Sequence, residues 1–236
     1  MEKTTITIAR KRLALILIGI AALLCITSIT LKFIEWELST NSTYWYYQTV
    51  RLFNVNRETS IPTWYSTLLL LSSAVLLAIT AYSAKMKKGR YIIHWWLLAL
   101  IFTYLSIDEA AAIHEKFTIY FQENLNLTGH LYFGWLLVGI PFALIVGLIY
   151  LKFLLHLPMQ TRLHFIFAAT LYVGGAIAIE SISSNLWYLN DGTSLEYSAV
   201  GTVEEFFEMS GVILFIYGLL TYISENTAGI EVRIKA

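Results

Sequence analysis

Carboxylates and an imidazole are concentrated in one short segment, Ser106–Glu115, whose sequence is SIDEAAAIHE. Asp108 and Glu115 are seven residues apart, so on a continuous helix they lie on nearly the same face, with His114 about one position around. Carboxylate oxygens and imidazole nitrogens bind divalent metal ions, and both groups act as general acids and bases. The segment therefore predicts an acid–base or metal site with Asp108, His114 and Glu115 as catalytic candidates.

Two later segments also carry carboxylates on helical faces. Glu204 and Glu208 have the i, i+4 spacing of neighbours on one face, and Glu180 follows small residues that allow helices to approach closely. At 1.5 Å per residue, all of these acids lie about 21–27 Å along their helices from one side of the membrane, as does Asp108. We expect them to face one another and to share a metal ion. The candidate ligands are Asp108, His114, Glu115, Glu180, Glu204 and Glu208.

The identity of the metal is left open by this ligand set. The Glu-x-x-His pairs of helical di-iron centres are absent, and zinc normally has more histidines or cysteines than this region offers. Hard oxygen ligands suit calcium as well. Iron, manganese, zinc and calcium therefore all remain possible cofactors, with Ser106 and Asn185 as candidates for supporting hydrogen bonds.

A purely structural explanation competes at some of these positions. Glu109, Glu115 and Glu205 can be solvated surface residues, and Glu204 and Glu205 stand near a helix start, where the helix dipole favours anions. On ideal helices, Glu109 and Glu205 also point away from the predicted site. Asp108, Glu180 and Glu208 are placed deeper without an evident basic partner, which favours a functional role.

The elements that must position these acids are predicted from composition. Of 236 residues, 57% are hydrophobic and 14% charged, whereas soluble domains average about 45–50% and about 25%. Six apolar stretches are long enough to cross a bilayer, at about 13–31, 64–84, 91–115, 131–155, 163–184 and 200–223. We expect an all-α, polytopic bundle of six transmembrane helices that forms a single domain over residues 1–236. The connection 32–63 is rich in Trp and Tyr and predicts a short interfacial helix over Tyr44–Phe53.

The charge balance, the cysteine content and the distribution of basic residues restrict the class of protein and its orientation in a membrane. Sixteen basic residues balance sixteen acidic ones, which argues against a nucleic-acid partner, and the single Cys25 excludes an intrachain disulfide. With the N-terminus inside, twelve Lys and Arg fall on the inner side and four on the outer side. This bias predicts a protein of the cell membrane with both termini in the cytoplasm.

The acids therefore lie toward the outer side, where a lipid could reach them laterally. We expect a metal-dependent enzyme acting on a lipid or other amphiphile by hydrolysis or metal-centred oxidation. The alternatives are a small proton- or cation-coupled transporter and an accessory subunit with partner membrane proteins. Membrane lipids are expected partners in each case.

Overall fold

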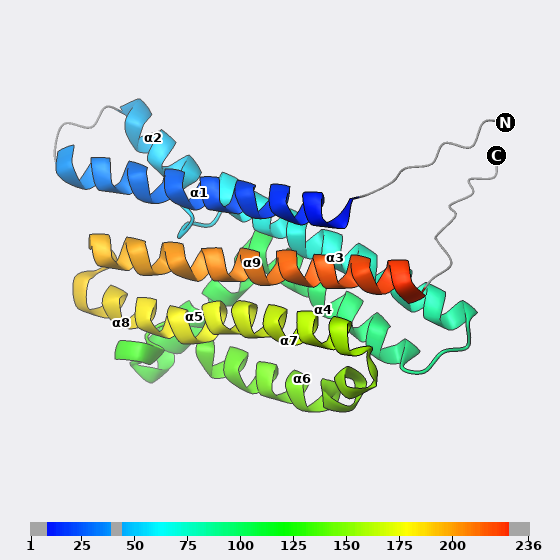
Figure 1. Ribbon diagram of the computed structural model, residues 1–236. Helices are drawn as coiled ribbons and strands as arrows, with labels where there is room; N and C mark the ends of the chain where they lie inside the picture. The colour runs from blue at the N-terminus through cyan, green and yellow to red at the C-terminus, as the bar shows by residue number, and fades with distance from the viewer. Residues whose placement is uncertain (1–8, 39–43, 227–236) are drawn as a thin grey trace, which may run out of the picture.

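The computed structural model describes residues 9–38 and 44–226, and over these ranges it is helical, without a strand (Figure 1). Six helical segments are long and apolar enough to cross a membrane: Arg10–Glu37, Ile61–Met86, Ile92–Ala111, Leu136–His156, Met159–Asn190 and Leu195–Asn226. The prediction of an all-α chain with six candidate spans is therefore confirmed. These helices are consistent with a multi-pass membrane protein.

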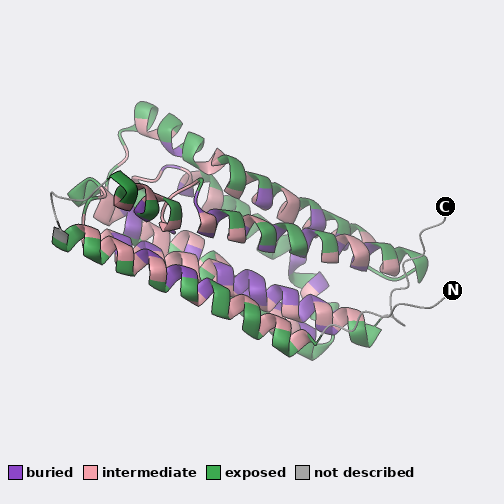
Figure 2. Cartoon of the chain, turned by 90° about the horizontal axis from the view of Figure 1, so that it is seen from above, coloured by how far each residue is buried: buried purple, intermediate pink, exposed green. Residues whose placement is uncertain are grey.

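Helix α9 (Leu195–Asn226) is the central element of the bundle. It packs against α1 (Arg10–Leu38), α3 (Ile61–Met86) and α7 (Met159–Val173), and α3 in turn packs along α4 (Ile92–Ala111). Buried residues accordingly line the faces that these helices turn toward one another (Figure 2). Arg10 and Asn226 lie at the same end of the bundle, here called the terminal end, and the opposite end is called the distal end (Figure 1).

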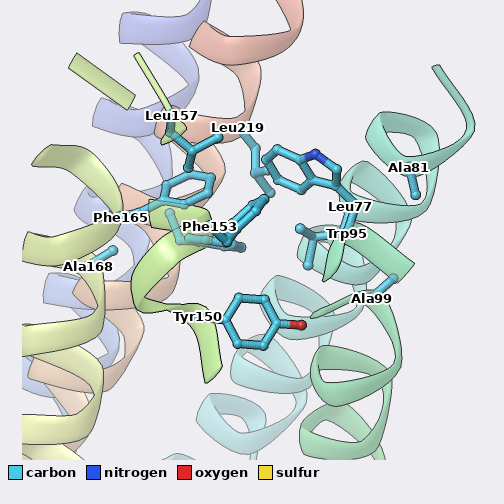
Figure 3. Close-up of a cluster of buried hydrophobic side chains, with 11 residues drawn as sticks. Leu77, Ala81, Trp95, Ala99, Tyr150, Phe153, Leu157, Phe165, Ala168 and Leu219 are labelled. Carbon is cyan, nitrogen blue, oxygen red and sulfur yellow. The ribbon is translucent and has the colours of Figure 1, made fainter. Parts of the chain in front are cut away.

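A cluster of buried aromatic, leucine and alanine side chains packs between the helices in the terminal half of the bundle (Figure 3). Trp95 of α4 meets Phe153 of α6 (Leu136–His156) edge-on at a centroid distance of 4.8 Å, and Phe165 of α7 lies against Phe215 at 4.5 Å. The Tyr150 hydroxyl donates to the carbonyl of His94 at 2.8 Å, which ties α6 to α4. This apolar cluster joins α3, α4, α6, α7 and α9.

The distal end carries the short elements. Helix α2 (Tyr44–Phe53) confirms the helix predicted in this connection, and the Tyr46 hydroxyl donates to the Leu31 carbonyl of α1 at 2.7 Å. Residues 39–43 of the same connection lie outside the described part of the chain. The remaining distal elements are α5 (Ile113–Leu125), the 3₁₀ turn Gly129–Leu131 and α8 (Glu180–Asn190).

The prediction of one continuous helix over 91–115 is wrong. Helix α4 ends at Ala111, and Ala112 adopts the left-handed conformation, with φ 50° and ψ 49°, before α5 begins at Ile113. The Asp108 carboxylate accepts a hydrogen bond from the His114 backbone N–H at 2.9 Å and so stabilises the start of the second helix. Asp108 and Glu115 are therefore on different helices instead of on one face of the same helix.

Candidate functional site

A polar cavity of about 100 Å³ lies at the distal end, between α3, α4, α5, α8 and α9. We call it the acidic chamber because six carboxylates line it together with one imidazole, namely Glu58, Glu109, Glu115, Glu180, Glu204, Glu205 and His114. Among the described residues, Arg57 is the only Lys or Arg in its lining. Negative charge is thus concentrated in a small enclosed volume.

His114 is held at the chamber wall by Asp108. The Nδ1 atom of His114 lies 3.0 Å from Asp108 Oδ2, and its Nε2 atom lies 3.7 Å from Glu58 Oε1. The side chain of His114 is 24% exposed, that of Asp108 is 16% exposed and that of Glu58 is 30% exposed. One ring nitrogen is therefore engaged by a carboxylate while the other is directed to a chamber residue.

The surroundings shift the pKa values of His114 and Glu58. Burial lowers the pKa of His114, but the Asp108 hydrogen bond and the charges of Asp108, Glu58 and Glu115 outweigh it and raise the value to about 9. Burial raises the pKa of Glu58 to about 7, with His114 lowering it and the charges of Glu115 and Asp108 raising it. These pKa values favour a cationic His114 and a partly protonated Glu58 at neutral pH.

Glu180 is brought to the chamber by an irregular helical segment. Gly174–Ile179 forms a π-helix between α7 and α8, and such bulges change the direction in which the following side chains point. The Trp135 indole N–H donates to Glu180 Oε1 at 2.8 Å. A Cβ on Gly175 would lie 2.9 Å from Glu208 Cγ and 3.0 Å from the Glu204 carbonyl oxygen, so only glycine permits this close approach to α9.

The acids of α9 divide between two cavities. Glu204 and Glu205 line the chamber, and Glu204 Oε2 accepts a hydrogen bond from Ser183 Oγ at 2.6 Å. Glu208 is one turn farther along and lines a separate small cavity of about 10 Å³. Glu109 lines both cavities and so connects them.

Residues 54–60, between α2 and α3, cover part of the chamber and supply Glu58. Asn56 Nδ2 donates to the Ser198 carbonyl of α9 at 3.3 Å, directly beside Gly201, which has no side chain to displace it. Among the described residues, Asn56 Oδ1 and Glu58 Oε2 are buried at this wall without a hydrogen-bond partner. Two acceptor oxygens are thus available to a water molecule or a ligand.

The structure brings together four of the predicted site residues in the chamber: His114, Glu115, Glu180 and Glu204. Asp108 contacts the Nδ1 atom of His114 but does not itself line the chamber, and Glu208 lines the neighbouring cavity. Ser106 donates to the Thr67 carbonyl at 3.0 Å, so its hydroxyl is engaged by α3, while Asn185 lies near Gly129.

Sequence reasoning missed three chamber residues. Glu109 and Glu205 were expected to point away, and Glu58 received no role. The available signal was the excess of acidic residues on the predicted outer side, which positive-inside topology does not require.

Within the described ranges, no group of three or more His, Cys, Asp or Glu side chains is arranged closely enough to hold a metal ion. The donor chemistry of the chamber nevertheless suits a divalent cation, since carboxylates surround one imidazole and unpartnered oxygens face them. His114, Glu58, Glu109 and Glu204 line the same cavity and are the residues that could supply ligands. The chamber is therefore a candidate site rather than a preformed one.

Comparison with known proteins gives a family but no activity. No curated protein and no solved structure matches this chain. One family model matches residues 13–223, which includes all six candidate spans at least in part and every chamber residue. The chain thus belongs to the family described as a domain of unknown function, DUF8692.

Proposed function

We propose that the acidic chamber binds a divalent metal ion in a membrane enzyme that acts on a lipid or other amphiphile. The observation that carries the proposal is the Asp108–His114 pair, which leaves His114 Nε2 directed toward Glu58 in the chamber. Metal-binding histidines almost always donate their second ring N–H to a carboxylate or carbonyl, which fixes the ring orientation. Asp108 is in the position of that carboxylate.

Charge balance gives independent support. Six carboxylates share the chamber with one arginine and one histidine, and ionised groups in or near a membrane interior are costly without a counter-charge. A divalent cation reduces the repulsion between the acids and allows several of them to stay ionised. Protonation is the other way to reduce this repulsion, and burial raises the pKa of Glu58 to about 7.

The residues of the chamber suit a hydrolytic or oxidative step on a headgroup. A bound metal would supply Lewis acidity and an activated water molecule, or redox chemistry if the metal is iron or manganese. His114 would hold the metal ion through Nε2, and Glu58 is placed to hold or move a proton at Oε1, while the Tyr197 and Ser183 hydroxyls can orient a polar group. Asp108 would act as a positioning residue that holds the imidazole.

Location in a membrane favours an amphiphilic substrate. The chamber is at the distal end of six apolar helices, while Lys85, Lys87, Lys88 and Arg90 are at the terminal end. By the positive-inside rule, the terminal end would face the cytoplasm and the chamber the outer leaflet of the cell membrane. Phospholipid headgroups would then be at the same level as the chamber.

The apolar cluster of the terminal half favours this enzyme over the transport alternative. Trp95, Phe153, Phe165 and Leu219 are 0–3% exposed and fill the space between helices on the far side of the carboxylates. Ion transport needs a polar route through both halves of the bundle. A chamber confined to one end of the bundle suits catalysis at that end.

The test is metal content in detergent-purified, full-length protein. We expect stoichiometric divalent metal in the wild type and loss of the chamber metal in Asp108→Asn and His114→Gln. Glu196→Gln, at an exposed position outside the chamber, is the matched control and keeps its metal. A wild-type protein that binds no metal after reconstitution with Mn²⁺, Fe²⁺, Zn²⁺ and Ca²⁺ contradicts the proposal.

A further inference from the structure

The small cavity beside the chamber has a lining suited to a cation. It lies between α3, α4, α7 and α9, and its polar lining consists of Ser66, Glu109, Tyr172 and Glu208. Leucines, a methionine and a valine form the rest of the wall. Two carboxylates from different helices therefore meet at an enclosed point deeper in the bundle than the chamber.

Ser66 provides an observation that is independent of the acids. It is 9% exposed, and its Oγ is buried without a hydrogen-bond partner among the described residues. Other hydroxyls of α3 behave differently, since Thr67, Ser73 and Thr80 each donate to the carbonyl four residues earlier, at 2.8–3.0 Å. A buried hydroxyl that makes no such bond costs stability unless another partner satisfies it.

The size of the cavity and the charge of its lining restrict which partner can satisfy the Ser66 hydroxyl. A cavity of about 10 Å³ holds at most one water-sized occupant. Its donors are all oxygen, which hard cations prefer, and no Lys, Arg or His lines it in the part of the chain that the structure describes. A divalent ion neutralises both carboxylates, whereas a sodium ion leaves one negative charge without compensation in an apolar surrounding.

We propose that this cavity binds one hard divalent cation, of the Mn²⁺ or Ca²⁺ type, through Glu109, Glu208, Ser66 and Tyr172. The site is separate from the acidic chamber and does not depend on the function proposed for it. Because Glu109 lines both cavities, a cation in one of them changes the charge available to the other. The two sites are thereby coupled through a single carboxylate.

The experiment measures Mn²⁺ binding to full-length protein in detergent, after removal of endogenous metal with a chelator. Free Mn²⁺ is followed by its electron paramagnetic resonance signal. We expect two bound Mn²⁺ in the wild type, loss of one in Glu208→Gln, and about tenfold weaker binding of that ion in Ser66→Ala. Ser73→Ala, which removes a buried hydroxyl bonded within its own helix, is the matched control and keeps both ions.

The variants also separate this proposal from the one for the chamber. In His114→Gln we expect the chamber ion to be lost and the deep ion to remain. One ion that is lost in Glu208→Gln but kept in His114→Gln supports the deep site and contradicts the chamber proposal. Unchanged Mn²⁺ binding in both Glu208→Gln and Ser66→Ala overturns the deep site, as does displacement of the deep ion by an equal concentration of Na⁺. Melting temperatures of the variants show that each remains folded.

Discussion

The two halves of the bundle are built differently. In the terminal half, regular helices meet through packed aromatic rings, and the side chains of the cluster around Trp95 and Phe153 are buried (Figure 3). In the distal half, α4 breaks at Ala112, a π-helix interrupts the segment before Glu180, and carboxylates line two cavities. Departures from regular helix and apolar packing are costly, and proteins tend to keep them at functional sites.

This comparison suggests a division of roles. The terminal half supplies most of the packing that holds the helices together. That packing offsets the free-energy cost of enclosing charged groups in the distal half. Changes in the terminal half should therefore lower stability and leave metal binding intact. Changes at the distal end should affect metal binding or proton affinity more than stability.

The largest effect on stability is expected for Trp95→Ala. Trp95 is 2% exposed and contacts Phe153, Phe165 and Tyr222, so its removal leaves a large cavity. We expect a loss of about 3–4 kcal/mol in the free energy of unfolding, measured by denaturant titration in detergent. The folded fraction should still bind metal as the wild type does. Loss of metal binding without loss of stability would contradict the division of roles.

Gly175→Ala tests the junction at which the π-helix meets α9. The added methyl would lie 3.0 Å from the Glu204 carbonyl oxygen, a backbone atom that cannot move without shifting the helix. We expect about 2 kcal/mol of destabilisation together with weaker metal binding, because both Glu204 and Glu208 are displaced. Gly147→Ala in α6 is the control, since its Cβ would meet no described atom within 4 Å. It should be neutral or slightly stabilising.

The all-helical fold with six candidate spans could be predicted from the sequence, because apolar length alone identifies helices that are long enough to cross a membrane. The break at Ala112 could not, because three consecutive alanines favour a continuous helix and only the contact from Asp108 to the His114 N–H reveals the turn. That contact spans six residues and depends on a side-chain conformation that helical periodicity does not encode.

The sequence predicted several of the residues that line the candidate site, but it predicted their arrangement less well. Residue type and depth identified Glu180, Glu204 and His114, which line the chamber. Glu58 comes from a connection whose position over α9 depends on Asn56 fitting beside Gly201, a contact between residues far apart in the chain. The π-helix over Gly174–Ile179 lies close against α9, and the direction of Glu180 that follows it does not correspond to ideal helical geometry.

Asp108→Asn should change the proton affinity of His114. The Asp108 hydrogen bond and charge contribute to raising the His114 pKa to about 9, so the neutral amide should lower it by about 1–2. Because the folded-state value is raised above the ordinary one, the charged pair stabilises the protein at low pH. That contribution is lost as the pH rises from about 6.5 through about 9.

Nuclear magnetic resonance of ¹³C-labelled histidine in metal-free protein measures this pKa directly. An unaltered His114 pKa in Asp108→Asn would show that other charges hold the proton. The charges of Glu58 and Glu115 would then account for the raised pKa of His114.

A smaller loss of stability than that of Trp95→Ala or Gly175→Ala is expected for Gly201→Ala. The new Cβ would lie 2.6 Å from the end of the Asn56 side chain, which can rotate away at the loss of its hydrogen bond to the Ser198 carbonyl. Loss of one such bond costs about 1 kcal/mol. The local consequence is larger, because residues 54–60 lose a direct tie to α9 while Glu58 stays on the same segment. Hydrogen exchange should therefore quicken at residues 54–60 and stay unchanged in the terminal half, and equal protection in both proteins would show that this segment is held by contacts other than Asn56.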